Sequence, residues 1–181
     1  MNPEYFDIEN LKIFGMWPHQ SYISRGIIPY IKRIKKDKVY MAVIGDLKGE
    51  SIVDMLETCG NKIEKIYVIN KYEGDDIDLV KSIFTKNTKN FKGKLVFKNN
   101  IQDLNGKDYL MDIVCVNDIS CTIDNLVLSY NITADNGIFC GNGHEVDKVK
   151  VALNGFRRQE KIGTPIQVSN RAIWFWNKRA L

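Results

Sequence analysis

A turn that could bind a ligand follows the first strongly apolar run of this sequence, residues 39–45. The run continues into Asp46-Leu47-Lys48-Gly49-Glu50-Ser51, so that Gly45 and Gly49 stand four residues apart. Glycine adopts positive φ and lets a ligand approach the backbone, and a helix that begins here would present N–H groups. Neither GxGxxG nor GxxxxGK[ST] is present. The pattern predicts either a ligand-binding turn or a plain tight connection between strand and helix.

Polar residues also stand at the ends of three further apolar runs. Asn70 and Lys71 close the second run, Asn100 follows the third, and Asn117 closes the fourth. In an open parallel sheet, ligands bind in the crevice outside the carboxyl ends of the strands. If the runs are strands, these side chains gather beside the glycine turn.

Three side chains are candidates for a general base. Asp118 follows the fourth run, where a carboxylate would face a bound ligand, although a turn or helix-capping role is an equal alternative. His144 lies among glycines in residues 141–145, and histidine is the side chain that most often serves as a general base, but it could equally be a surface residue at a helix start. His19, in the N-terminal segment, is the third candidate.

Metal chemistry has little support in the spacing of ligand residues. Asp118, Asn142 and Glu145 could supply oxygen ligands to a divalent cation, but a metal-free site fits their spacing equally well. The cysteines form no CxxC pair, so the sequence predicts neither a zinc site nor a disulfide framework. We expect most of the four, Cys59, Cys115, Cys121 and Cys140, to be small apolar residues of the core.

The elements that must position these residues alternate between short β-branched runs and longer segments of helical periodicity. The runs are continuously apolar, which is typical of interior strands covered on both faces, and they span residues 39–45, 65–70, 94–98, 112–117 and 137–141. Residues 22–36 are predicted as a helix before the first strand. Residues 165–168 and 172–176 suit an antiparallel hairpin, and we expect Trp174-Phe175-Trp176 to pack in the core.

Composition favours one compact soluble domain. The 181 residues are 44% hydrophobic and 27% charged, with a net charge of +4, which excludes a wholly disordered chain. We predict an N-terminal flap or extension over residues 1–21 and a single domain over residues 22–181. No apolar run approaches the roughly 20 residues that cross a bilayer, and the start lacks signal-peptide features. A cytoplasmic protein without a membrane partner is expected, and the oligomeric state stays open.

The motif order resembles that of class I S-adenosylmethionine-dependent methyltransferases, in particular their small-molecule and sugar O-methyltransferase branch. The segments that carry the resemblance are AVIGDLKGESIVDML, KIYVINKYEGDD, VCVNDIS, ADNGIFCGNG, VKVALNGF and AIWFWNK. The resemblance implies an α/β fold: a Rossmann-like methyltransferase fold with three α/β/α layers and a mostly parallel seven-stranded sheet that ends in an antiparallel hairpin. It also implies methyl transfer from S-adenosylmethionine to a hydroxyl of a small acceptor, with a sugar or glycan unit as the best single guess.

Matched position by position, the resemblance also implies a cofactor site. The glycine turn would surround the methionine end, Asn70 would bind the ribose, Lys71 and Tyr72 would lie at the adenine edge, and the loop after the third strand would bind adenine. Asn117 and Ser120 would face both cofactor and acceptor. The residues so implied are Gly45, Asp46, Lys48, Gly49, Ser51, Asn70, Lys71, Tyr72, Asn100, Ile101, Asn117 and Ser120.

Three positions depart from the family's usual acids, because Val43, Asn70 and Asn117 stand there instead. An amide binds a ribose hydroxyl less strongly than a carboxylate, by about 1 kcal/mol for each change. A catalytically degenerate binding module with the same fold is therefore one alternative. An RNA methyltransferase is another, favoured by the basic residues of segment 32–38 and by Arg157-Arg158, although such runs are usually solvated faces and we expect no nucleic-acid partner.

Overall fold

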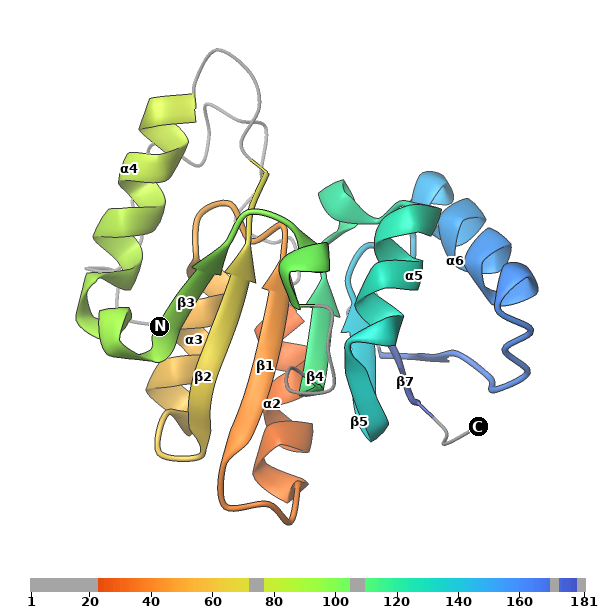
Figure 1. Ribbon diagram of the computed structural model, residues 1–181, viewed down its shortest axis with the longest axis horizontal. Helices are drawn as coiled ribbons and strands as arrows, with labels where there is room; N and C mark the ends of the chain where they lie inside the picture. The colour runs from red at the N-terminus through yellow and green to blue at the C-terminus, as the bar shows by residue number, and fades with distance from the viewer. Residues whose placement is uncertain (1–22, 72–76, 105–109, 170–172, 179–181) are drawn as a thin grey trace.

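A computed structural model describes residues 23–71, 77–104, 110–169 and 173–178. It contains a seven-stranded sheet in the order β3-β2-β1-β4-β5-β7-β6 (Figure 1), in which β7 runs antiparallel to β5 and β6. The pairs among β1, β2, β3, β4 and β5 are parallel. This is the predicted methyltransferase-like fold with its antiparallel hairpin. The predicted extension over residues 1–21, with His19, and Tyr72 lie outside the described residues.

The strands keep close to the predicted runs. They are β1 (Val39–Ile44), β2 (Ile63–Ile69), β3 (Leu95–Lys98), β4 (Met111–Val116), β5 (Thr133–Gly141), β6 (Gln167–Val168) and β7 (Trp174–Asn177). The prediction that all five runs form interior strands is wrong for β3, which pairs with β2 alone and lies at the sheet edge. Its Phe97 is 60% exposed. An apolar run does not reveal the edge position, which depends on the order of strands in space.

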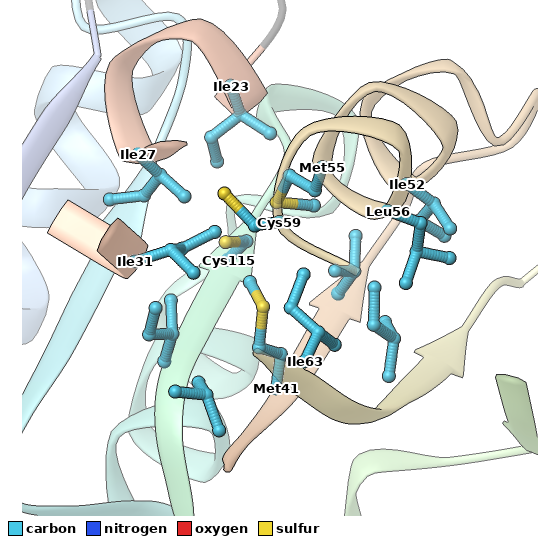
Figure 2. Close-up of a cluster of buried hydrophobic side chains, with 14 of the residues drawn as sticks. Ile23, Ile27, Ile31, Met41, Ile52, Met55, Leu56, Cys59, Ile63 and Cys115 are labelled. Carbon is cyan, nitrogen blue, oxygen red and sulfur yellow. The ribbon is translucent and has the colours of Figure 1, made fainter. Parts of the chain in front are cut away.

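Helices cover both faces of the sheet, and they are α2 (Ile23–Arg33), α3 (Glu50–Cys59), α4 (Ile77–Thr88), α5 (Ile123–Asn131) and α6 (Asp147–Gln159). Side chains of α2 and α3 and Phe84 of α4 pack with β1 and β2 in one apolar cluster (Figure 2), and α5 and α6 pack with β5 and β7 in the other. The four cysteines are buried and free, as predicted. Among the described helices, none is both long and apolar enough for a bilayer crossing.

The C-terminal aromatic residues pack in the core, as predicted. Trp174, Phe175 and Trp176 are at most 7% exposed. The Trp176 ring lies 5.1 Å from the ring of Phe139, centre to centre, and the Trp174 Nε1 donates a hydrogen bond of 3.1 Å to the Asn142 carbonyl. The hairpin of β6 and β7 therefore completes the sheet beside β5, and the Trp174 hydrogen bond holds the loop after β5 in place.

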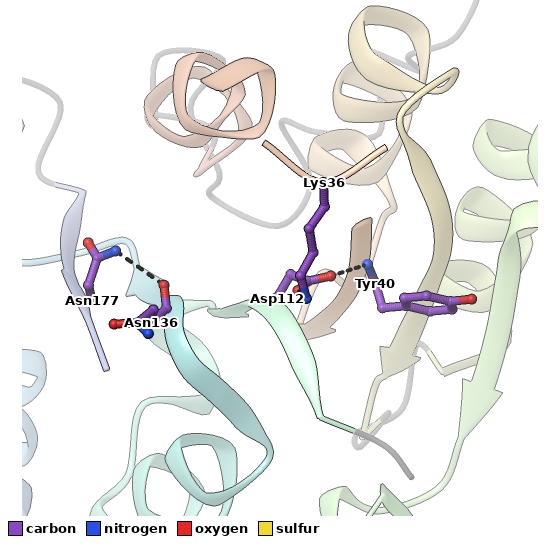
Figure 3. Close-up of polar contacts among 5 residues, drawn as sticks. All are labelled: Lys36, Tyr40, Asp112, Asn136 and Asn177. Carbon is purple, nitrogen blue, oxygen red and sulfur yellow. Dashed lines mark hydrogen bonds and ion pairs between the residues drawn. The ribbon is translucent and has the colours of Figure 1, made fainter. Parts of the chain in front are cut away.

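Where the strands begin, a buried carboxylate ties two of them together (Figure 3). Asp112 of β4 accepts hydrogen bonds from the Tyr40 backbone N–H at 3.0 Å and from the Lys36 Nζ at 2.5 Å. Nearby, Asn177 donates to the Asn136 carbonyl at 3.3 Å. The start of β1 is thus fixed to β4 by one side chain.

Asp112→Ala is expected to lower the free energy of unfolding by about 1–2 kcal/mol, because the Tyr40 N–H loses its acceptor while the exposed Lys36 loses only a screened partner. Urea denaturation measures the change. Asp37→Ala, at an exposed position of the same edge, is the matched control and should change stability by less than half as much. Equal losses of unfolding free energy in the two variants would show that Asp112 does not fix the start of β1 to β4.

Candidate cofactor site

The glycine turn lies between β2 and β4 at the carboxyl ends of the parallel strands. Gly45 donates its N–H to the Ile69 carbonyl at 3.0 Å, and Asn117 donates its N–H to the Ile44 carbonyl at 2.9 Å. Gly45 and Gly49 have φ of 84° and 76°, a left-handed conformation that other residues rarely adopt. A Cβ on Gly45 would lie 3.1 Å from the Ser120 Cβ and still closer to its hydroxyl oxygen. Glycine at position 45 is therefore required by both conformation and space.

A cavity of about 220 Å³ lies beside this turn, at the carboxyl ends of β1 and β2. It brings together four of the residues that the sequence predicts for the cofactor site, namely Lys71, Asn100, Ile101 and Ser120. It also contains residues that sequence reasoning missed: Ile44, Ile69, Asn99, Gln102 and Asn125. Most of these flank predicted residues along the chain, so widening each motif by one or two positions would have found them. Asn125 is the exception, because only helix α5 brings it to the cavity.

Asp46 points into its own turn. Its carboxylate accepts hydrogen bonds of 3.1 Å from the N–H groups of Gly49 and Ile52, at the beginning of α3. Burial raises the pKa of Asp46 to about 6, although these backbone hydrogen bonds oppose the rise. The carboxylate thus occupies N–H groups that an anionic part of a ligand would otherwise use.

Two further charged side chains are buried beside Asp46. Lys48 and Glu50 are 4% and 7% exposed. Burial and the neighbouring Asp46 raise the pKa of Glu50 to about 7, while Lys48 lowers it. Burial lowers the pKa of Lys48, and Glu50 opposes that shift. Above about pH 7, where both acids are ionised, the turn contains two acids and one base and favours positive charge on a ligand next to it. Ser51, also predicted for the site, is buried at the start of α3.

These pKa shifts predict that the folded protein loses stability as the pH rises. The folded pKa values, about 6 for Asp46 and about 7 for Glu50, exceed the ordinary values of about 4 for unfolded carboxyls. The stabilisation is complete below about pH 4 and is lost as the pH rises through 6 and 7. Melting temperatures between pH 5 and 8 should therefore depend less on pH in Glu50→Gln than in the wild type. Glu57→Gln, at an exposed position, is the control, and its melting temperatures should depend on pH as those of the wild type do. If the melting temperatures of the two variants depend on pH in the same way, Glu50 is not the source of the pH dependence.

The two strand positions without the usual acid have structural roles. Val43 is fully buried in the core, where a carboxylate would be costly. The Asn70 side chain donates a hydrogen bond of 2.8 Å from Nδ2 to the Asp46 carbonyl, which ties the end of β2 to the glycine turn. A carboxylate at position 70 has no proton to donate there. The amide at this position is therefore required by the local backbone.

Asn117 presents an unpartnered donor next to the turn. Its side chain is buried, with 8% exposed, and its Nδ2 has no hydrogen-bond partner among the described residues. A buried unsatisfied amide is costly, so a ligand with an acceptor oxygen would relieve it. Together with the cavity and the positive-φ glycines, this orphaned donor shows that the residues present fit a nucleoside cofactor.

The candidate bases come from two loops that touch each other. The Asp118 N–H donates a hydrogen bond of 2.7 Å to the Asn142 Oδ1, and a Cβ on Gly143 would lie 2.7 Å from the Asp118 Cβ. Asp118 and His144 are both partly buried and lie outside the cavity lining. Among the described residues, no cluster of three or more His, Cys, Asp or Glu side chains could hold a metal ion. The Asn142 oxygen, one of the conceivable ligands, is already engaged by Asp118.

Comparisons with solved structures agree with this fold. TomG, an O-methyltransferase from Streptomyces achromogenes solved in complex with SAM, is 8% identical, with a TM-score of 0.66 over 94% of this chain and 87% of that one. The O-methyltransferase from Bacillus cereus, solved with SAH, is 10% identical, with a TM-score of 0.62 over 98% of this chain and 92% of that one. The chain thus has the fold of class I S-adenosylmethionine-dependent O-methyltransferases.

The same fold also occurs with another activity. Spermidine synthase from Thermotoga maritima is 15% identical, with a TM-score of 0.59 over 87% of this chain and 59% of that one. No family model and no curated protein matches the sequence. At these identities the likeness establishes the fold, and function has to be argued from the site.

Proposed function

We propose that this protein is an S-adenosylmethionine-dependent O-methyltransferase that acts on a hydroxyl of a small molecule. The observation that carries the proposal is the cavity beside the glycine turn, where four predicted cofactor residues meet. At about 220 Å³ it is smaller than the roughly 300–1,000 Å³ of a typical ligand site, which suits the nucleoside part of the cofactor. A sugar or glycan acceptor and a cytoplasmic location are our finer proposals.

Residues of this chain would hold the cofactor in two parts. Ile101 and the two isoleucines that end β1 and β2, Ile44 and Ile69, give the cavity apolar walls for a purine. Asn100 and Lys71 provide polar groups at the same cavity. The net negative charge of the glycine turn suits the cationic amino and sulfonium groups of the methionine end.

The chain's chemical task is then limited. S-adenosylmethionine supplies an activated methyl group when bound. The protein has to hold the acceptor oxygen in line with that group and accept the hydroxyl proton. We propose that the Asp118 carboxylate accepts the proton of the acceptor hydroxyl. His144, on the adjoining loop, is the alternative proton acceptor. Both belong to the touching loops after β4 and β5.

Calorimetric titration with S-adenosylmethionine and S-adenosylhomocysteine tests the cofactor site. We expect both to bind with dissociation constants in the micromolar range, and ATP, whose triphosphate meets a net negative turn, to bind far more weakly. No heat and no thermal shift at millimolar cofactor would refute the proposal.

A non-catalytic binding module is the second candidate. It is favoured by the Asp46 carboxylate, which occupies the start of α3, and by the amide at Asn70. Both candidates bind the cofactor, so turnover distinguishes them. Release of S-adenosylhomocysteine that depends on an added hydroxyl compound, from a panel that includes sugars and phenols, supports the enzyme. Tight binding with no release across that panel supports the module.

A further inference from the structure

The structure gathers lysines from three separate segments at the edge where β1, β2 and β3 begin, at the lower left of Figure 1. We call this surface the basic edge and define it as segments 32–38, 57–65 and 86–94. It contains eleven of the chain's 26 basic residues and three of its 22 acidic ones. Acidic residues outnumber basic ones in the rest of the chain. Although the net charge is only +4, basic residues are therefore concentrated on this edge of the molecule.

Hydrogen bonds show that the three segments form one continuous surface. The Lys62 Nζ donates to the carbonyls of Lys32 and Ile34, which joins the turn before β2 to the end of α2. The Lys65 Nζ donates to the Gly93 carbonyl at 2.8 Å, which joins β2 to the segment before β3. Order along the sheet, and not proximity in sequence, brings the charges together.

Most of the cations on the basic edge face solvent. Eight of the eleven are exposed: Lys32, Arg33, Lys35, Lys36, Lys38, Lys86, Lys89 and Lys92. Like charges at such density repel one another, and a polyanion would relieve that repulsion. The only acids in these segments are Asp37, Glu57 and Glu64, which are too few to neutralise them.

We propose that the basic edge binds the phosphate backbone of a nucleic-acid duplex without sequence preference. Lysine contacts phosphate as a point charge, whereas the planar fork of arginine suits bidentate recognition, and ten of the eleven cations are lysines. The only aromatic side chain in these segments is Phe91, which is half-buried against the core. The surface therefore offers no stacking platform for single strands and no apolar anchor for a membrane.

The basic edge lies at the opposite end of the strands from the cavity. β2 has seven residues, which places the two ends roughly 20 Å apart. A duplex bound at the basic edge is thus a docking partner and not the methyl acceptor. This inference holds whether or not the protein transfers methyl groups.

Fluorescence anisotropy with a labelled DNA duplex of about 20 base pairs, at about 50 and 200 mM salt, tests this inference. The triple variant Lys35→Gln, Lys89→Gln, Lys92→Gln should bind at least tenfold more weakly at the lower salt, and its salt slope should fall by about 3. The matched variant Lys81→Gln, Lys148→Gln, Lys150→Gln removes the same charge from exposed sites elsewhere on the molecule. It should bind as the wild type does.

Three outcomes would overturn the inference. They are no duplex binding by the wild type at 50 mM salt, equal losses in the two triple variants, and binding to phosphatidylserine vesicles in place of the duplex. The melting temperature and the S-adenosylmethionine affinity of each variant are measured in parallel, so that misfolding or a failed cofactor site is recognised separately.

Discussion

Replacing Gly45 with alanine is expected to abolish cofactor binding and to lower the free energy of unfolding by about 2–5 kcal/mol. The left-handed φ of 84° costs a residue with a Cβ about 1–2 kcal/mol, and overpacking in a tight site costs about 1–3 kcal/mol more. The new methyl group would press on Ser120, which lines the cavity. Relief of the clash moves that wall and changes the shape of the cavity.

Urea denaturation and calorimetric titration measure the two effects of Gly45→Ala. Gly93→Ala is the matched control, because a Cβ there has no heavy atom within 4 Å. It should keep both wild-type stability and wild-type affinity. If Gly45→Ala binds S-adenosylmethionine as tightly as the wild type, the glycine turn does not border the cofactor.

Asn70→Asp is expected to weaken the cofactor site, although it introduces the acid that the resemblance to methyltransferases implies at this position. The Asp46 carbonyl loses the donor that now lies 2.8 Å away and meets a carboxylate in its place. The Gly49 N–H, at 3.3 Å, remains as a donor to this carbonyl, so the lost hydrogen bond costs about 1 kcal/mol, and the carboxylate that faces the carbonyl adds to that cost. The variant adds a negative charge close to a turn that already contains two acids, Asp46 and Glu50. We therefore expect lower stability and at least tenfold weaker cofactor binding at pH 8.

Lower pH should restore part of the stability of Asn70→Asp, because a protonated carboxyl can again donate to the carbonyl. Melting temperatures from pH 5 to 8 measure this recovery. Asn154→Asp, at an exposed position of α6, is the control and should melt as the wild type does throughout. Tighter cofactor binding by Asn70→Asp would show that Asn70 replaces a cofactor-binding carboxylate. It would contradict the role of the amide in holding the glycine turn.

The sequence alone predicted most of the strands and helices, because their signals are local. Continuous apolar runs marked β1, β2 and β4, helical periodicity marked the segments between them, and the two β-rich runs at the end predicted the antiparallel hairpin. The sequence also pointed to the turn at Gly45 and Gly49, since glycine adopts positive φ at little steric cost. Motif order then predicted Lys71, Asn100, Ile101 and Ser120 as neighbours in space.

Only the tertiary structure decided which way the polar side chains face. The Asp46 carboxylate accepts hydrogen bonds at the start of α3, and the Asn70 amide, which stands where the resemblance implies an acid, fixes the glycine turn. The edge position of β3 and the basic edge both depend on strand order. Residue type fixes what a side chain can donate or accept, but its partner is set by segments distant in the chain, and those become neighbours only when the sheet assembles.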